Sequence, residues 1–225
     1  MEDFTQILQL KVNLFGIVLR FNVKTIIMTW IVMGILIVFS LLARKRMGII
    51  PNPFQTVAEL LITAFYDICI DTLEDEELGK KYFPLICALF MFLLVSNWLG
   101  IIPKLSEPTR DLNTPLGMGI MGFFIAQYAG IREKGFKEYI KGYLEPIFIM
   151  APLNVIGEIS KVISISFRLF GNIMGGAIII IVVSYLVYSL LLPPILNLFF
   201  GLFVGTIQAL VFTLLTLVYI AVQVK

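Results

Sequence analysis

Hydrophobic residues gather in five long runs along this chain, and short segments rich in charge separate them. An α-helix needs about 20 apolar residues to cross the hydrocarbon core of a bilayer. Each run is close to that length or longer, so the pattern predicts five membrane-embedded helices. Their expected ranges are residues 25–43, 82–102, 114–131, 146–190 and 195–224.

A sixth segment, over residues 53–72, has a mixed pattern. Glu59, Asp67 and Asp71 are set among apolar residues, which is typical of an amphipathic helix that lies in the membrane interface. We therefore expect an all-α membrane protein with one integral-membrane domain over residues 1–225.

The run over 146–190 is longer than a perpendicular span requires. Such a helix must tilt strongly, bend or lie along the bilayer. Pro193 and Pro194 are expected to mark its turn into the last helix, because proline interrupts a helix. The last two helices are therefore expected to form a long, tilted hairpin.

Basic residues follow the first and the third of these spans, and cytoplasmic loops carry an excess of lysine and arginine. This rule places the N-terminus outside and Lys225 in the cytoplasm. The residues that decide it are Arg44, Lys45, Arg46, Arg132, Lys134, Lys137 and Lys141.

Composition supports the membrane assignment and excludes several kinds of site. The chain is 59% hydrophobic and 14% charged, and its net charge of +2 gives no indication of a nucleic-acid partner. Histidine is absent, which excludes histidine metal sites and Ser-His-Asp or Cys-His nucleophiles. Cys69 and Cys87 lack the spacing of a metal or redox motif and are expected to be packing residues. We expect no bound metal and no tightly bound cofactor.

Arg168 stands in a run where a charge is costly. No residue from Leu169 to Val224 carries a charge. Arginine stays protonated at any biological pH, and at mid-bilayer it costs about 2.5–3.5 kcal/mol on insertion scales. A charge kept at that cost indicates a functional site.

Small and polar residues share one side of the helix that holds Arg168. They recur at spacings of three and four, which places them on one face. A small-residue face lets another helix approach closely; the alternative is packing inside this chain. The stripe comprises Gly157, Lys161, Ser164, Arg168, Gly171, Asn172 and Gly175.

The last helix has a matching feature in Gly201, Gly205 and Gln208, with Thr206 adjacent. Buried polar groups in lipid need partners. Gln208 is therefore expected to face Asn172 or the neighbourhood of Arg168, and an ordinary interhelical hydrogen bond explains the spacing equally well.

No carboxylate of this chain is an obvious membrane partner for Arg168. Glu158, ten residues before it, lies about 15 Å away along the helix axis. The missing partner suggests that another chain supplies the carboxylate.

Several segments resemble, in order, the a subunit of F-type ATP synthases. The most characteristic is SISFRLFGNIMGG, residues 164–176, and the match covers most of the chain after residue 51. The further segments are Pro53-Phe54-Gln55-Thr56 with Glu59, Asn97-Trp98-Leu99-Gly100 with Pro103, Asp111-Leu112-Asn113-Thr114, and Gln208 in its helix.

The resemblance implies a non-catalytic stator subunit in a bacterial plasma membrane. Its partners would be a ring of c subunits, a peripheral stalk of b subunits and the rest of the complex. Two offset half-channels would carry a cation, H⁺ or Na⁺, to and from the ring carboxylates. Arg168 maps onto the family's essential arginine, and Asn172 and Gln208 onto polar positions near it.

Other residues are expected along the ion path. Ser164 and Thr206 are expected beside the arginine region. The residues expected toward the cytoplasmic half-channel are Glu158, Lys161 and Glu145, and those expected at the outer access are Asn97, Asp111 and Asn113. For the acidic and basic residues of the inner group, interface anchoring and subunit contact is an equal alternative.

Two positions depart from the family. Ala177 and Gly201 stand where many members carry a carboxylate and some a histidine. Either water with Asn, Ser and Thr groups suffices for H⁺, or the ion is Na⁺, which needs oxygen ligands rather than a relay. Na⁺ as the translocated ion is slightly favoured.

Two other functions are compatible with a polytopic chain. An independent channel or secondary transporter would use Arg168 to bind an anionic substrate and would work without partners. An intramembrane enzyme is disfavoured, because the chain lacks histidine and a convincing nucleophile–base pair.

Overall fold

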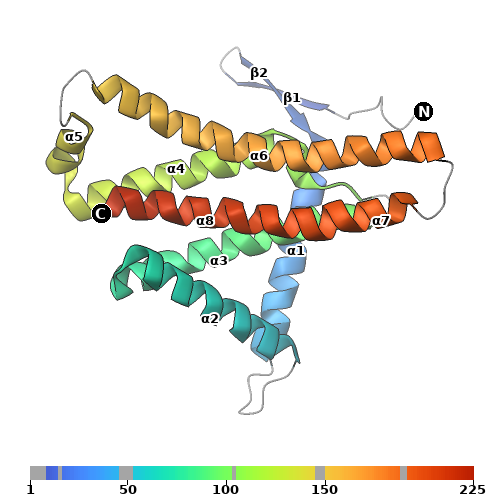
Figure 1. The fold of residues 1–225 in the computed structure, drawn as a ribbon, viewed down its shortest axis with the longest axis horizontal. Coiled ribbons are helices and arrows are strands. Elements are labelled where there is room, and N and C mark those ends of the chain that lie inside the picture. The colour runs from blue at the N-terminus through green and yellow to red at the C-terminus, as the bar shows by residue number, and fades with distance from the viewer. Residues whose placement is uncertain (1–8, 15–16, 46–52, 103–104, 145–149, 188–191) are drawn as a thin grey trace.

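The computed structural model describes residues 9–14, 17–45, 53–102, 105–144, 150–187 and 192–225, and helices dominate it (Figure 1). Five helical stretches in these ranges are long and apolar enough to cross a membrane. They confirm the predicted all-α membrane class with five spans. The helices are α1 (Val23–Lys45), α2 (Pro53–Leu73), α3 (Glu76–Trp98), α4 (Asn113–Lys134), α5 (Phe136–Leu144), α6 (Met150–Val187), α7 (Leu192–Leu198) and α8 (Gly205–Val224).

Two short elements were not expected. A hairpin of β1 (Gln9–Leu14) and β2 (Ile17–Asn22) pairs antiparallel from Gln9 opposite Asn22 to Leu14 opposite Ile17. The nine-residue helix α5 follows α4 directly. Both are far shorter than a membrane span, so a search for membrane-length apolar runs passes over them.

The helix α3 begins at Glu76, earlier than the expected start at residue 82. Its N-cap explains the difference, because one Asp75 carboxylate oxygen accepts hydrogen bonds from the backbone N–H of Glu77 at 2.7 Å and of Leu78 at 3.2 Å. The acidic side chains of the first turn also suit the positive end of the helix dipole. Hydropathy alone misses such a charged first turn.

The last span is built from three joined pieces. A π-helical segment, η4 (Phe199–Val204), connects α7 to α8. Pro193 and Pro194, expected to lie in the turn before this span, instead lie in the first turn of α7. Proline is tolerated there because the first backbone N–H groups of a helix have no partner within it.

The helix α8 lies at the centre of the packing and contacts α3, α4 and α6. Its side chains Phe212, Leu217 and Ile220 are fully buried, as are Ile86 and Leu93 of α3. These apolar contacts hold the long helices side by side and fix the position of α6.

The four helices α3, α4, α6 and α8 run alongside one another, whereas α1 crosses their direction (Figure 1). The 38 residues of α6 extend about 57 Å at 1.5 Å per residue, nearly twice the thickness of the hydrocarbon core. If the axis of α1 is perpendicular to the bilayer, the axes of α6 and α8 are strongly tilted from that direction, and this tilt accommodates the length of α6.

Two ion pairs show which helix ends meet. Lys225 after α8 pairs with Glu74 after α2 at 2.8 Å, and Lys81 of α3 pairs with Glu133 of α4 at 2.7 Å. Exposed pairs of this kind add little stability. They show that the start of α3 and the ends of α2, α4 and α8 share one end of the bundle.

At the other end, a buried amide ties three segments together. The Asn97 side chain is fully buried; its Nδ2 donates to the Gly205 carbonyl at 2.8 Å, and its Oδ1 accepts from the Thr109 hydroxyl at 2.8 Å. Thr109 belongs to η3 (Pro108–Arg110), a 3-10 turn in the loop between α3 and α4. The bonds hold this loop against the bundle.

Candidate functional site

One face of α6 is open along most of its length. A Cβ atom added at Gly157, Gly171 or Gly175 would meet no atom within 4 Å in the described part of the chain. Gly176 is turned the other way, because a Cβ there would lie 2.9 Å from the Phe200 ring. The alternative that these three glycines serve packing inside the chain is therefore wrong.

Arg168 projects from this open face. Its side chain is exposed, and so is that of Ser164 one turn before it. Ile165 and Leu169, which border this face on one side of the same helix, are buried in the core. No side chain in the described residues forms an ion pair with Arg168. The charge is thus directed away from the chain's own bundle.

A hydrogen bond joins α6 to α8 close to Arg168. Asn172 Nδ2 donates to Gln208 Oε1 at 2.8 Å, and Gln208 is almost fully buried. The prediction that Gln208 faces Asn172 or the neighbourhood of Arg168 is confirmed, and the contact is an interhelical hydrogen bond. The neighbouring glycines face elsewhere, since a Cβ at Gly201 would overlap Ile101 and one at Gly205 would press on Asn97.

Thr206 also faces α3, since its hydroxyl accepts a hydrogen bond from Trp98 Nε1 at 2.9 Å. Of the polar residues expected on the last helix, only Gln208 is therefore brought to the stripe on α6.

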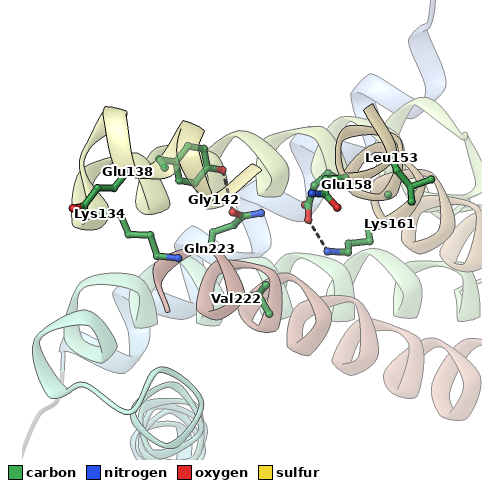
Figure 2. A pocket seen from close by; sticks show the side chains of 11 residues that line it. Lys134, Glu138, Gly142, Leu153, Glu158, Lys161, Val222 and Gln223 are labelled. Atoms are coloured by element: carbon green, nitrogen blue, oxygen red, sulfur yellow. Dashed lines mark hydrogen bonds and ion pairs between the residues drawn. The ribbon is translucent and has the colours of Figure 1, made fainter. Parts of the chain in front are cut away.

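A cavity of about 420 Å³ lies between the start of α6, α5 and the end of α8. We call it the Glu158 cavity. Figure 2 shows Glu158 and Lys161 in its wall, joined by an ion pair of 2.6 Å, with Glu138 and Gln223 around the same space. The structure thus brings the two predicted inner residues together, while Glu145 lies outside the described residues.

A second cavity, of about 550 Å³, lies at the other end of the bundle. We call it the Glu107 cavity. Its wall comes from η2 (Leu99–Ile101), the following loop, α6, α7 and η4, and it contains both Ala177 and Gly201. Glu107 and Arg110 are the charged side chains in this wall.

Sequence patterns did not single out Glu107. It lies in the loop SEPTRDLN, where no helical or strand period assigns it to a face. Burial raises the pKa of its carboxyl, although the positive charges of Arg110 and Lys24 oppose the shift.

The three residues expected at the outer access do not line this cavity. Asn97 is occupied by the two structural hydrogen bonds described above. Asp111 accepts from the Thr25 hydroxyl at 3.1 Å and from Asn113 Nδ2 at 2.9 Å. Asn97 and Asp111 thus connect separate segments of the chain, and Asn113 bonds locally to Asp111.

The two cavities lie on either side of Arg168 along α6. Lys161 is the last α6 residue in the wall of the Glu158 cavity, and Ile173 is the first in the wall of the Glu107 cavity. At 1.5 Å per residue these positions are about 18 Å apart. Arg168 lies between them and lines neither cavity.

The described residues contain no group of three or more His, Cys, Asp or Glu side chains placed to hold a metal ion. The arrangement offers two cavities, each with charged side chains in its wall, and one exposed guanidinium between them.

Comparison with known proteins places this geometry in a family. Residues 26–221 match the family described as ATP synthase A chain. The chain is 38% identical to ATP synthase subunit a of Moorella thermoacetica, over 88% of this chain and 89% of that protein. It is 39% identical to ATP synthase subunit a 2 of Syntrophotalea carbinolica, over 86% of this chain and 82% of that protein. The chain belongs to the ATP synthase A chain family and is a membrane-sector subunit of an F-type ATP synthase.

Proposed function

We propose that this chain is the stator that couples cation movement to rotation of a c-subunit ring. One observation carries the proposal: Arg168 occupies an open helix face between two cavities at opposite ends of the bundle. Each cavity serves as a half-channel that reaches the middle of the membrane from one side. The subunit itself catalyses no reaction of ATP.

In this mechanism a cation enters through the Glu107 cavity and binds a carboxylate of the ring. The ring carries it around to the Glu158 cavity, where it leaves. Each unit charge that crosses 100 mV supplies about 2.3 kcal/mol, which the ring collects as torque.

The Arg168 guanidinium acts between the two cavities. It attracts the arriving carboxylate, favours release of its cation and prevents direct passage from one half-channel to the other. Opposite charges 4 Å apart gain about 4 kcal/mol at an effective dielectric of 20, enough to offset the burial cost of about 2.5–3.5 kcal/mol. Arg168 does not carry the proton, because guanidinium stays protonated.

The hydrogen bond between Asn172 and Gln208 supports Arg168 indirectly. It joins α6 to α8 one helical turn beyond the arginine. A shift of α6 relative to α8 would move the guanidinium, so this bond helps to hold the charge at the face that meets the ring.

The positive-inside rule supports one orientation. The end of the bundle that holds Lys225, Arg132 and Lys134 is assigned to the cytoplasm, so the N-terminus and the Glu107 cavity lie outside. The expected partners are the c ring, a b-subunit stalk and the rest of the complex. The cation is H⁺ or Na⁺, and the ligands of the ring carboxylate decide which.

Replacement of Arg168 by alanine tests the proposal in the whole complex in liposomes. We expect the loss of ATP synthesis driven by an ion gradient, while the detached catalytic head still hydrolyses ATP. Arg132→Ala, at the exposed end of α4, is the matched control and should retain synthesis. Sustained coupled synthesis by the Arg168 variant would refute the proposal.

Replacement of Gln208 by alanine tests whether Gln208 contributes less to coupled ATP synthesis than Arg168 does. It removes the hydrogen bond to Asn172 but keeps the guanidinium, so we expect a partial loss of synthesis. A loss as complete as that of the Arg168 variant would contradict this ranking.

A further inference from the structure

The outer loop carries an acidic side chain into the Glu107 cavity. Glu107 is the carboxylate among the described residues that form the wall, where the other charged side chain is Arg110. The Glu107 side chain folds over η2, because a Cβ added at Gly100 would overlap its carboxylate. The acidic group thus lies inside the bundle end rather than at the loop surface.

The loop is fixed where it delivers this carboxylate. Pro108 and Thr109, the next two residues, are buried, and Thr109 is bonded to the Asn97 amide. The Glu107 carbonyl accepts a hydrogen bond from the Arg110 backbone N–H at 3.1 Å. The position of Glu107 therefore follows from buried contacts on its C-terminal side.

The Glu107 carboxylate has no evident structural role in the described part of the chain. Its side chain does not cap η3, although Glu107 is the N-cap residue, and it forms no ion pair there. The Glu107 side chain is half-buried, and its carboxylate accepts a hydrogen bond from the backbone of Glu107 itself, which offsets only part of the desolvation of the charged form.

Few charges surround this group. Arg110 of η3 and Lys24 of α1 face it, and α6, α7 and η4 contribute only uncharged side chains to the cavity wall. Burial outweighs these two positive charges, so the pKa of the carboxyl is raised. A carboxyl of this kind exchanges a proton closer to neutral pH than an exposed one does.

We propose that the Glu107 carboxylate binds the translocated monovalent cation as it passes from the outer water into the cavity. The inference rests on the proposed function, because it names the group that serves the outer half-channel. For H⁺ the carboxylate takes a proton from outer water and returns it on the cavity side. For Na⁺ its oxygens replace part of the hydration shell and release the ion intact.

Potential-driven ATP synthesis by the whole complex in liposomes tests this role. The outer cation concentration is varied at fixed inner composition, once as pH without Na⁺ and once as Na⁺ at constant pH. In Glu107→Gln we expect the outer cation concentration for half-maximal rate to rise about tenfold, because the substitution removes the negative charge that attracts cations into a cavity where Arg110 repels them. The maximal rate should be retained, and Glu107→Asp should stay close to the unmodified chain.

The titration that shifts identifies the cation as H⁺ or Na⁺. Glu77→Gln, an exposed carboxylate at the opposite end, is the matched control and should change neither titration. A purely structural role of Glu107 would lower the maximal rate at every concentration, and that result would overturn the proposal. So would two unshifted titrations.

Arg110→Gln provides a second variant that does not depend on assembly of the first. Removal of this positive charge should raise the Glu107 pKa further and shift the H⁺ titration to higher outer pH, or lower the half-maximal Na⁺ concentration. No shift in either titration would overturn the proposal. Arg168→Ala, measured in parallel, distinguishes failure of the proposed function from failure of the role of Glu107. If Arg168→Ala abolishes coupling while the Glu107 and Arg110 variants behave like the unmodified chain, only the role of Glu107 is refuted.

Discussion

Gly171 offers a direct test of whether the open face of α6 meets another chain. A Cβ at this position has no neighbour within 4 Å in the described residues, so Gly171→Leu adds a side chain to free space in the isolated subunit. In a helix the loss of glycine is itself favourable by about 0.5–1 kcal/mol. The substitution should therefore leave the subunit's own fold intact.

Against the ring, the same leucine should be unfavourable. Close helix contact depends on small residues, and extra methylenes in a packed contact cost about 1–3 kcal/mol. At 1.4 kcal/mol per tenfold, the affinity for the ring should fall by a factor between about 5 and about 140. Coupled synthesis should decrease by a similar factor when contact with the ring limits it.

The assay is ATP-driven cation pumping in inverted membrane vesicles, with the amount of c subunit retained on purification as a second readout. Gly34→Leu is the matched control, because Gly34 of α1 also has no neighbour within 4 Å. Normal pumping and ring retention in the Gly171 variant would refute the assignment of this face to the ring.

Three other expectations concern the interior of the subunit. Asn97→Leu removes two buried hydrogen bonds and leaves the Thr109 hydroxyl without its partner, so it should destabilise the subunit by about 2–4 kcal/mol. The variant chain should leave the heated complex at a lower temperature, and an unchanged release temperature would contradict the expectation. Gly176→Ala brings a Cβ to 2.9 Å from Phe200 and should lower stability by about 1–3 kcal/mol in the same assay, whereas Gly175→Ala, one residue away in open space, should not. Burial and the neighbouring Cys87 raise the pKa of Cys69 to about 11. In a Cys87→Ser variant burial still acts on Cys69, so maleimide labelling of the folded complex should be slow at pH 8 and accelerate only at strongly alkaline pH. Labelling at pH 8 as fast as in the denatured chain would show that Cys69 is exposed.

The membrane architecture could be predicted because its cause is local in sequence. Each span is a continuous apolar run, and the stripe around Arg168 follows from helical spacing alone. The contact between Asn172 and Gln208 could also be predicted, because polar side chains in apolar helices require hydrogen-bond partners. These features depend on the period of one helix or on a simple pairing rule.

The Glu107 cavity could not be predicted in the same way. Its wall combines α6 with a loop and with η4, and the position of Glu107 depends on a hydrogen bond between Thr109 and Asn97, twelve residues apart. The orientation of Gly201 toward η2 and of Gly205 toward α3 likewise depends on the π-helical segment that changes the helical phase before α8. Spacing within one helix carries no information on such contacts.

The offset of the two cavities along α6 bears on how voltage becomes rotation. If water fills both cavities during turnover, each is near the potential of its own side, and the membrane potential falls across the protein between them. That interval is about 18 Å long, and with α1 upright in the bilayer it follows an inclined helix, so the electric field there has a component parallel to the membrane. A potential of 100 mV over this length exerts a force of about 9 pN on a unit charge. On the proposed function, a charge on the ring surface would therefore experience a force with a component parallel to the membrane, the plane in which the ring would turn.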